Sequence, residues 1–309
     1  MKAVAESPSK AIITGEHFVV HGAWALAAAL PRKVRVEMRP SSGLRVRSDR
    51  FGELPSPELE PVALVVEEMA KEFSVTPSVS VSIKSGVPGG AGLGSSAATA
   101  VAVASAFSRL NSLGLGPDEL ARFAMVGERR IHGNPSGIDP AICARGGVIL
   151  YRPGSRPRRV HLEGPRTLLV SYSGVNRSTK GQIGHVATVK GRFPGLFSAL
   201  VEGVGELSLS GAELLSRGDM KGLGRLLTIN HSVLSAVGVS NERLDGMVDL
   251  LGSLGCYGAK LTGAGGGGSV VAVCPGGKEK SIVSGLAARG FETFRAKVPV
   301  VGVRSWSER

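Results

Sequence analysis

The glycine- and serine-rich segment GAGLGSSAAT, residues 90–99, most constrains what this chain can fold into. It stands between the alternating SVSVSI of residues 78–83, which predicts a strand, and an alanine-rich run that predicts a helix over about 95–110. Glycines let backbone amides approach an anion, and a helix N-terminus offers free N–H groups. The segment therefore predicts a phosphate-binding loop, with a serine-capped structural turn as the alternative.

Two familiar nucleotide motifs are excluded by context. The P-loop pattern requires a lysine where Ser95 stands, so a cation for the phosphate must come from another part of the chain. A second glycine cluster, LTGAGGGGSVVA at 261–272, formally contains G-x-G-x-x-G but leads into a strand instead of the helix of a dinucleotide fingerprint. We expect this cluster to bring backbone close to a ligand; the alternative is a flexible hairpin tip.

Charged residues elsewhere complete a set of groups suited to phosphoryl transfer. SPSKAIITGEHFVVHG contains Lys10, Glu16 and His17, in an order that is not the H-E-x-x-H of zinc proteases. GERRIHGNPSGIDPA supplies Glu128 near the end of a helix and Asp139 in the turn expected after it. A cation, carboxylates and an anion-binding loop are the components of phosphoryl transfer. Taken singly, each could be a solvated charge, an exposed ion pair or a turn cap.

Composition narrows the partners and the location. The net charge of +12 favours anionic ligands, but the basic residues are scattered without interleaved aromatics, so we expect no nucleic-acid partner. Cys143, Cys256 and Cys274 are odd in number and far apart, which predicts free thiols and not a disulfide framework or a zinc site. No apolar run reaches the ~18–20 residues of a membrane span, so we expect no membrane partner and a cytoplasmic location.

The order of predicted elements indicates an α+β chain of two domains. Strands dominate early, helices dominate from about 180 to 254, and strands return at 259–263, 269–274 and 298–303. The polar, proline-rich RPGSRPRR lies between the two parts. We therefore predict domains of residues 1–160 and 161–309.

Three segments together resemble the GHMP small-molecule kinases. They are SKAIITGEHFVVHG at 9–22, PGGAGLGSSAA at 88–98 and KLTGAGGGG at 260–268, in the order that the family has. HGNPSGID at 132–139, RSTK at 177–180 and NHSVLSAVGVSNERLD at 230–245 are similar to the members of the family that phosphorylate mevalonate. The resemblance spans nearly the whole chain.

The resemblance implies a two-domain GHMP kinase fold, in which an N-terminal domain similar to domain 2 of ribosomal protein S5 precedes a ferredoxin-like α/β domain. ATP would lie between the domains with Mg²⁺, held by Ser96 and Glu128, and mevalonate would be the acceptor. The residues implied to wrap the phosphates are Pro88, Gly89, Gly90, Ala91, Gly92, Leu93, Gly94, Ser95 and Ser96.

By the same resemblance, Asp139 would face the acceptor hydroxyl with Lys10 beside it, and either remove its proton or orient the alcohol. The residues implied to contact the acceptor are Lys10, His17, Asp139, Thr179 and Gly265. For His17, a hydrogen-bonded structural role is the alternative.

Several alternatives remain at this stage. Galactokinases share the G-E-H but continue with an acidic residue, where this chain has the apolar FVV of residues 18–20, which disfavours a sugar. Phosphomevalonate kinase, mevalonate 3-kinase and homoserine kinase share the glycine loops. A noncatalytic nucleotide- or RNA-binding protein is the alternative of another class, and the joint presence of Lys10, Glu128 and Asp139 argues against it. A homodimer is the oligomeric state that we consider, although no sequence feature selects it.

Overall fold

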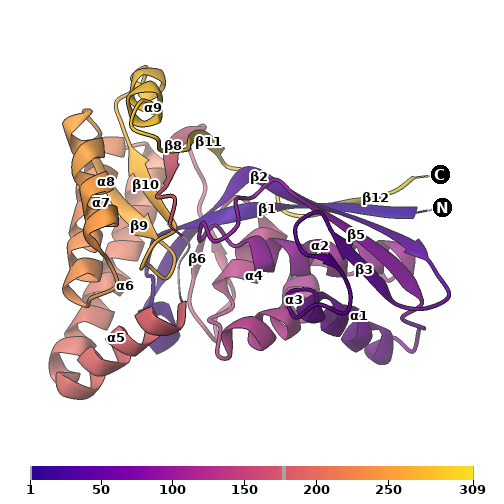
Figure 1. Ribbon diagram of the computed structural model, residues 1–309. Helices are drawn as coiled ribbons and strands as arrows, with labels where there is room; N and C mark the ends of the chain where they lie inside the picture. The colour runs from indigo at the N-terminus through magenta and orange to yellow at the C-terminus, as the bar shows by residue number, and fades with distance from the viewer. Residues whose placement is uncertain (1, 176–178, 309) are drawn as a thin grey trace.

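The structure is a computed structural model that describes residues 2–175 and 179–308, with side chains from residue 181 onward in the second range. Figure 1 shows two units, each with helices against a sheet. The predicted two-unit α+β fold is confirmed. Within the described residues, no helix is both long and apolar enough to cross a membrane.

The first sheet has the strand order β12-β1-β2-β5-β3-β4, and β6 pairs with β2 and β7. Its pairs are antiparallel except β3 with β5. The helices α1, α2, α3 and α4 lie along one face of it (Figure 1). The elements are β1 (Lys2–Thr14), β2 (Ala25–Pro40), β3 (Arg45–Ser48), β4 (Gly52–Glu53), β5 (Val79–Ser85), β6 (Val148–Tyr151), β7 (Arg158–Arg159), β12 (Arg304–Glu308), α1 (Glu60–Glu72), α2 (Ser95–Leu110), α3 (Pro117–His132) and α4 (Ile138–Arg145); the short 3₁₀ helix η1 (Val19–His21) lies between β1 and β2.

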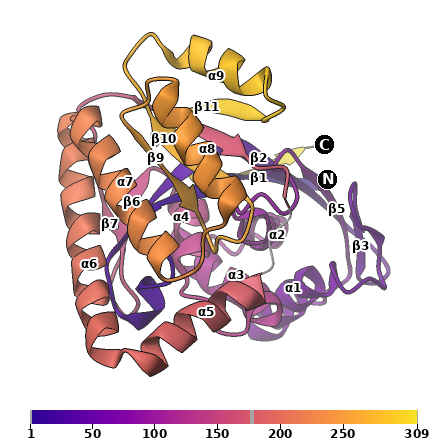
Figure 2. The same cartoon turned by 60° about the vertical axis from the view of Figure 1, so that its left-hand side comes forward.

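The second sheet is antiparallel, with the order β11-β8-β10-β9. Figure 2 shows α6, α7 and α8 side by side along this unit, with α5 crossing at their lower end. The elements are β8 (Arg166–Tyr172), β9 (Gly258–Thr262), β10 (Ser269–Val273), β11 (Thr293–Val298), α5 (Thr179–Arg192), α6 (Pro194–Arg217), α7 (Met220–Ala236), α8 (Glu242–Ser253) and α9 (Glu279–Ala287).

The alanine-rich start of β2 lies at the centre of the molecule. Every residue from 25 to 30 has a relative exposure of 0 %, and this stretch contacts β1 and β6 as neighbours while α4 and α6 pack against β2. Small side chains allow that close packing on both faces, which outweighs the helix propensity of alanine.

The C-terminal segment differs from the prediction. A strand was expected at 298–303, but β11 ends at Val298, Pro299 follows, and β12 begins only at Arg304. Proline lacks the N–H that continued pairing needs, and the chain here crosses from the second sheet to the first. The predicted boundary between two domains at residue 160 stays a prediction. That prediction did not include the return of β12 to the first sheet, where it pairs with β1.

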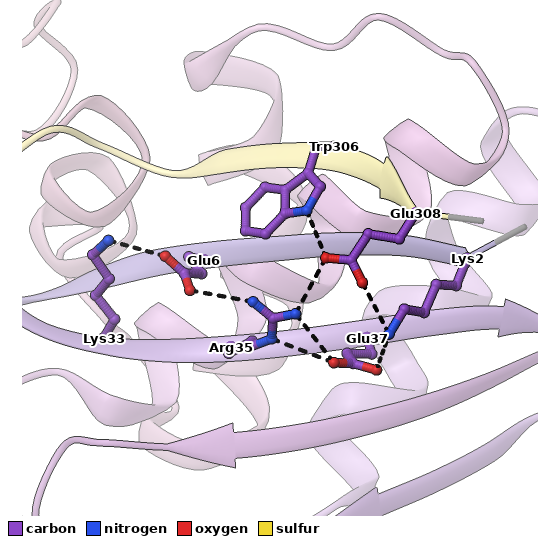
Figure 3. Close-up of polar contacts among 7 residues, drawn as sticks. All are labelled: Lys2, Glu6, Lys33, Arg35, Glu37, Trp306 and Glu308. Atoms are coloured by element: carbon purple, nitrogen blue, oxygen red, sulfur yellow. Dashed lines mark hydrogen bonds and ion pairs between the residues drawn. The ribbon is translucent and has the colours of Figure 1, made fainter.

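An ion-pair network holds β12 against β1 and β2 (Figure 3). Lys2 Nζ lies 2.8 Å from a carboxylate oxygen of Glu37 and 3.0 Å from one of Glu308. Arg35 contacts both glutamates as well, and its guanidinium lies over the ring of Trp306. The two ends of the chain are therefore joined by charged groups on one face of the sheet.

Candidate active site

The first glycine loop leads directly into the N-terminus of α2. Gly90, Gly92 and Gly94 all have positive φ angles, of 67°, 77° and 72°, which side chains rarely tolerate. Gly94 is the N-cap of α2, and no side-chain capping bond is present there. The alternative in which serine hydroxyls cap the helix is therefore wrong, and the first turn keeps its N–H groups for a ligand.

Lys10 supplies the cation that the loop itself lacks. Its side chain is 2 % exposed, and Nζ lies 3.1 Å from Asp139 Oδ2. The Lys10 backbone N–H donates to the Leu93 carbonyl over 2.9 Å, which fixes β1 to the loop. Asp139 was expected in a turn, but it lies in the first turn of α4, where a carboxylate is favoured by the helix dipole. The predicted pairing of lysine and aspartate is present.

A cavity adjoins this pair, and it shares Glu128 with a second cavity at the glycine loop. The first, of about 550 Å³, is lined by Lys10, His17, Glu128 and Asp139 among others. The second, of about 460 Å³, is lined by the loop residues Gly89, Gly90, Ser95 and Ser96, and again by Glu128. Since Glu128 faces both cavities, two ligands bound in them would meet at its carboxylate.

Glu128 is buried in α3, with a relative exposure of 2 %. Its Oε2 lies 3.8 Å from His132 Nε2, one helical turn further along. Ser96 and Glu128 together offer a hydroxyl and a carboxylate to the second cavity. Oxygen donors of this kind suit Mg²⁺, which usually takes one or two carboxylates and completes its shell with phosphates and water.

A buried ion pair beneath the first cavity was missed from the sequence. Lys260 in β9 donates to Glu16 and also to the Leu261 carbonyl. Burial raises the pKa of Glu16 and lowers the pKa of Lys260, because both charges leave water. The available signal was a lysine inside the apolar stretch 258–262, since a fully buried lysine needs a partner.

Comparisons with known proteins show the family of this chain. The family model for the N-terminal domain of GHMP kinases matches residues 60–147, and the model for their C-terminal domain matches residues 212–292. A curated mevalonate kinase of Aeropyrum pernix is 35 % identical over 97 % of both chains. This chain belongs to the GHMP kinase family.

Two further similarities cover nearly the full length of this GHMP kinase. A curated mevalonate kinase of Thermococcus sibiricus is 34 % identical over 98 % of both chains. A crystal structure of L. major mevalonate kinase in complex with R-mevalonate is 30 % identical, covers 96 % of each chain and gives a TM-score of 0.83. The predicted GHMP kinase fold and the kinase class are therefore confirmed.

The two units of the kinase are hydrogen-bonded to each other at the site. The Thr262 hydroxyl bonds with both the backbone N–H and the carbonyl of Ile12, each over 2.9 Å. The Ser269 hydroxyl donates to the Ala91 carbonyl over 2.8 Å. These contacts connect the second glycine cluster with β1 and with the first glycine loop.

Of the other residues predicted to contact the acceptor, His17 lines the first cavity, Gly265 does not, and the side chain of Thr179 is not described. His17 has a φ of 60°, and its Nε2 bonds with the Ala264 carbonyl over 2.8 Å while it lines the first cavity. Among the described residues around that cavity are Gly263 and Ala264, but not Gly265. A Cβ at position 265 would stand 2.0 Å from the Val239 carbonyl oxygen, so backbone packing alone accounts for that glycine. The side chain of Thr179 lies outside the described residues.

Proposed function

We propose that this kinase transfers the terminal phosphoryl group of ATP to the 5-hydroxyl of mevalonate. The pair of Lys10 and Asp139 lines the first cavity, which we assign to the acceptor, and this cavity shares Glu128 with the second cavity, at the glycine loop, which we assign to the nucleotide; this arrangement carries the proposal. The curated relatives that match over nearly the whole chain are mevalonate kinases, which supports mevalonate as the acceptor.

The residues divide the chemistry between them. The N–H groups at the start of α2 and the backbone of the glycine loop would hold the phosphates by fixed dipoles, so that little reorganisation is needed as charge develops. Asp139 would orient the acceptor hydroxyl and receive its proton, and Lys10 would stabilise the oxygen as it becomes an alkoxide. The apolar residues Ile12, Val19 and Ile138 line the acceptor cavity and would contact the carbon skeleton of the acceptor.

Mg²⁺ belongs to this proposal as the ion that neutralises the phosphate oxygens. Ser96 and Glu128 would suit this ion, because both oxygen donors line the second cavity, where we place the nucleotide. The described residues contain no cluster of three or more His, Cys, Asp or Glu side chains placed to hold a metal. This pattern agrees with an ion bound mainly through phosphates and water.

The first test is ADP release with Mg²⁺ and ATP, with mevalonate, phosphomevalonate, homoserine and galactose offered separately and the product examined by phosphorus NMR. We expect release with mevalonate alone and a 5-phosphate product. A 3-phosphate, or turnover of another acceptor, would keep the kinase but overturn the assigned acceptor. No release in any assay, from folded protein that binds RNA with steep salt dependence, would favour the noncatalytic alternative.

The expectations of a cytoplasmic location and of a homodimer stay predictions. Size-exclusion chromatography with light scattering measures the oligomeric state directly.

A further inference from the structure

The turn between β3 and β4 lies beside the strand that leads into the phosphate loop. β3 and β5 pair in parallel, with Ser48 opposite Ile83. Beyond this pairing, the Asp49 N–H donates to the Ile83 carbonyl over 3.1 Å, and Asp49 Oδ2 accepts from the Ser85 N–H over 3.2 Å. The turn is thus fixed to the last residues before the loop.

Arg50, at the tip of this turn, reaches the start of the loop. Its Nη2 donates to the Ser85 carbonyl over 3.2 Å and also to the Val87 carbonyl. Its Nη1 lies 3.6 Å from where a Cβ of Gly89 would stand. Both bonds come from Nη2 while Nη1 lies beside position 89, so one planar guanidinium occupies two positions along the start of the loop, which the single nitrogen of a lysine ammonium cannot do.

The charge of Arg50 is also available to a ligand. Among the described residues, no carboxylate lies within ion-pair distance of it. It lines the second cavity together with Gly89, Gly90 and Ser96. A cation in this position adds to the positive potential of the helix N-terminus.

We infer that Arg50 is a positioning residue that holds the start of the phosphate loop in its nucleotide-binding conformation. It acts chiefly through its two bonds to backbone carbonyls and not through its charge alone. The inference rests on the proposed function only for the identity of the nucleotide cavity. It concerns a residue outside the glycine loop and outside the magnesium and acceptor groups.

The test compares R50A and R50K with R47A. Arg47 is on the same hairpin, is 74 % exposed and pairs with Glu53, so R47A removes the same charge without touching the loop. We expect R50A and R50K to raise the dissociation constant of Mg-ADP and the KM for ATP by about 10-fold, the scale of losing charged hydrogen bonds. R47A should bind as the wild type does, and the KM for mevalonate should stay unchanged in all three variants.

Backbone amide hydrogen exchange, measured without nucleotide, distinguishes a positioning role of Arg50 from a role of its charge alone. The amides of residues 87–94 should exchange several-fold faster in R50A and R50K, while those of α2 beyond its first turn stay protected. Wild-type nucleotide affinity in R50A, or full rescue by R50K with unchanged exchange, would overturn the inference. Neither the dissociation constant of Mg-ADP nor the hydrogen exchange requires an acceptor, so failure of the inference is distinguishable from failure of the proposed reaction.

Discussion

Gly94 lies directly against the side chain of Lys10. A Cβ at position 94 would stand 2.7 Å from Lys10 Cγ and 2.9 Å from Lys10 Cε, closer than van der Waals contact permits. A side chain at position 94 would therefore overlap the lysine that pairs with Asp139. The loop conformation and the lysine position depend on each other.

The substitution G94A should displace Lys10 from Asp139. We expect kcat to fall by at least 10-fold, because displacing a catalytic group by about 1 Å lowers the reaction rate on that scale or more. G114A is the matched control: Gly114 also has a positive φ, of 67°, but nothing lies within 4 Å of a Cβ there. Steady-state kinetics of both variants, with melting curves, separate the steric effect from backbone strain, and equal kcat values in the two would contradict the prediction.

Removing the charge of Asp139 should abolish most turnover. D139N keeps the shape of the side chain but cannot accept the proton, so we expect kcat to fall by at least ~100-fold, the scale of general-base effects. K10M should also lower kcat, because the developing alkoxide loses its cation. D118N, at an exposed ion pair with Arg145, is the control for aspartate loss in general. Wild-type kcat in folded D139N would exclude the assigned role.

Glu128 gives a prediction about magnesium. E128Q keeps one oxygen donor but loses the charge, so we expect the Mg²⁺ concentration for half-maximal activity to rise, with partial recovery at high Mg²⁺. E72Q, at an exposed ion pair with Arg122, should leave the Mg²⁺ dependence unchanged. A Mg²⁺ titration of the reaction rate measures this. The same half-maximal concentration in E128Q and the wild type would show that Glu128 does not hold the ion.

The pair of Glu16 and Lys260 predicts strong energetic coupling. E16Q or K260M alone leaves the other charge buried without its counterion, so we expect each to lower the free energy of unfolding by about 3 kcal/mol or more. The double variant should lose less than the sum of the two single losses. Urea unfolding measures all three, with E213Q, at an exposed ion pair on α6, as the control. Strict additivity would contradict the coupling.

Local patterns predicted much of the fold. The strand over 78–83 and the helix near 95–110 follow from side-chain periodicity, and the structure has β5 and α2 there. By contrast, no local pattern indicates that β1 continues through Pro8 to Thr14. Its register shifts between Pro8 and Ser9, so a bulge accommodates the proline.

The candidate site was predictable where its residues form motifs and not where they act through tertiary contacts. Lys10 and Asp139 were paired through the family resemblance, because their separation of 129 positions gives no local signal. Lys260, Arg50 and the contact of Gly265 with Val239 depend on how distant segments pack. Sequence periodicity carries no information on such contacts.

Acid should loosen the C-terminal strand first. Hydrogen bonds from Lys2 lower the pKa of Glu37 and of Glu308 below the ordinary value of 4.5. Groups with lowered folded-state pKa values stabilise the fold above their unfolded pKa, and this contribution disappears as the pH falls below about 4.5. Because these groups are partly exposed, 1 M salt should reduce the effect.

Tryptophan fluorescence of a W24F variant reports on this process, because Trp306 is then the remaining tryptophan and donates to Glu308 over 2.8 Å. We expect its emission to shift to the red between pH 5 and pH 3, before the helices of the first unit lose their circular dichroism. E308Q should remove part of this pH dependence, since one of the two titrating partners of Lys2 is gone. E53Q, at the exposed pair with Arg47, should leave the profile unchanged. A single shared midpoint for fluorescence and circular dichroism would show instead that β12 unfolds only with the whole sheet.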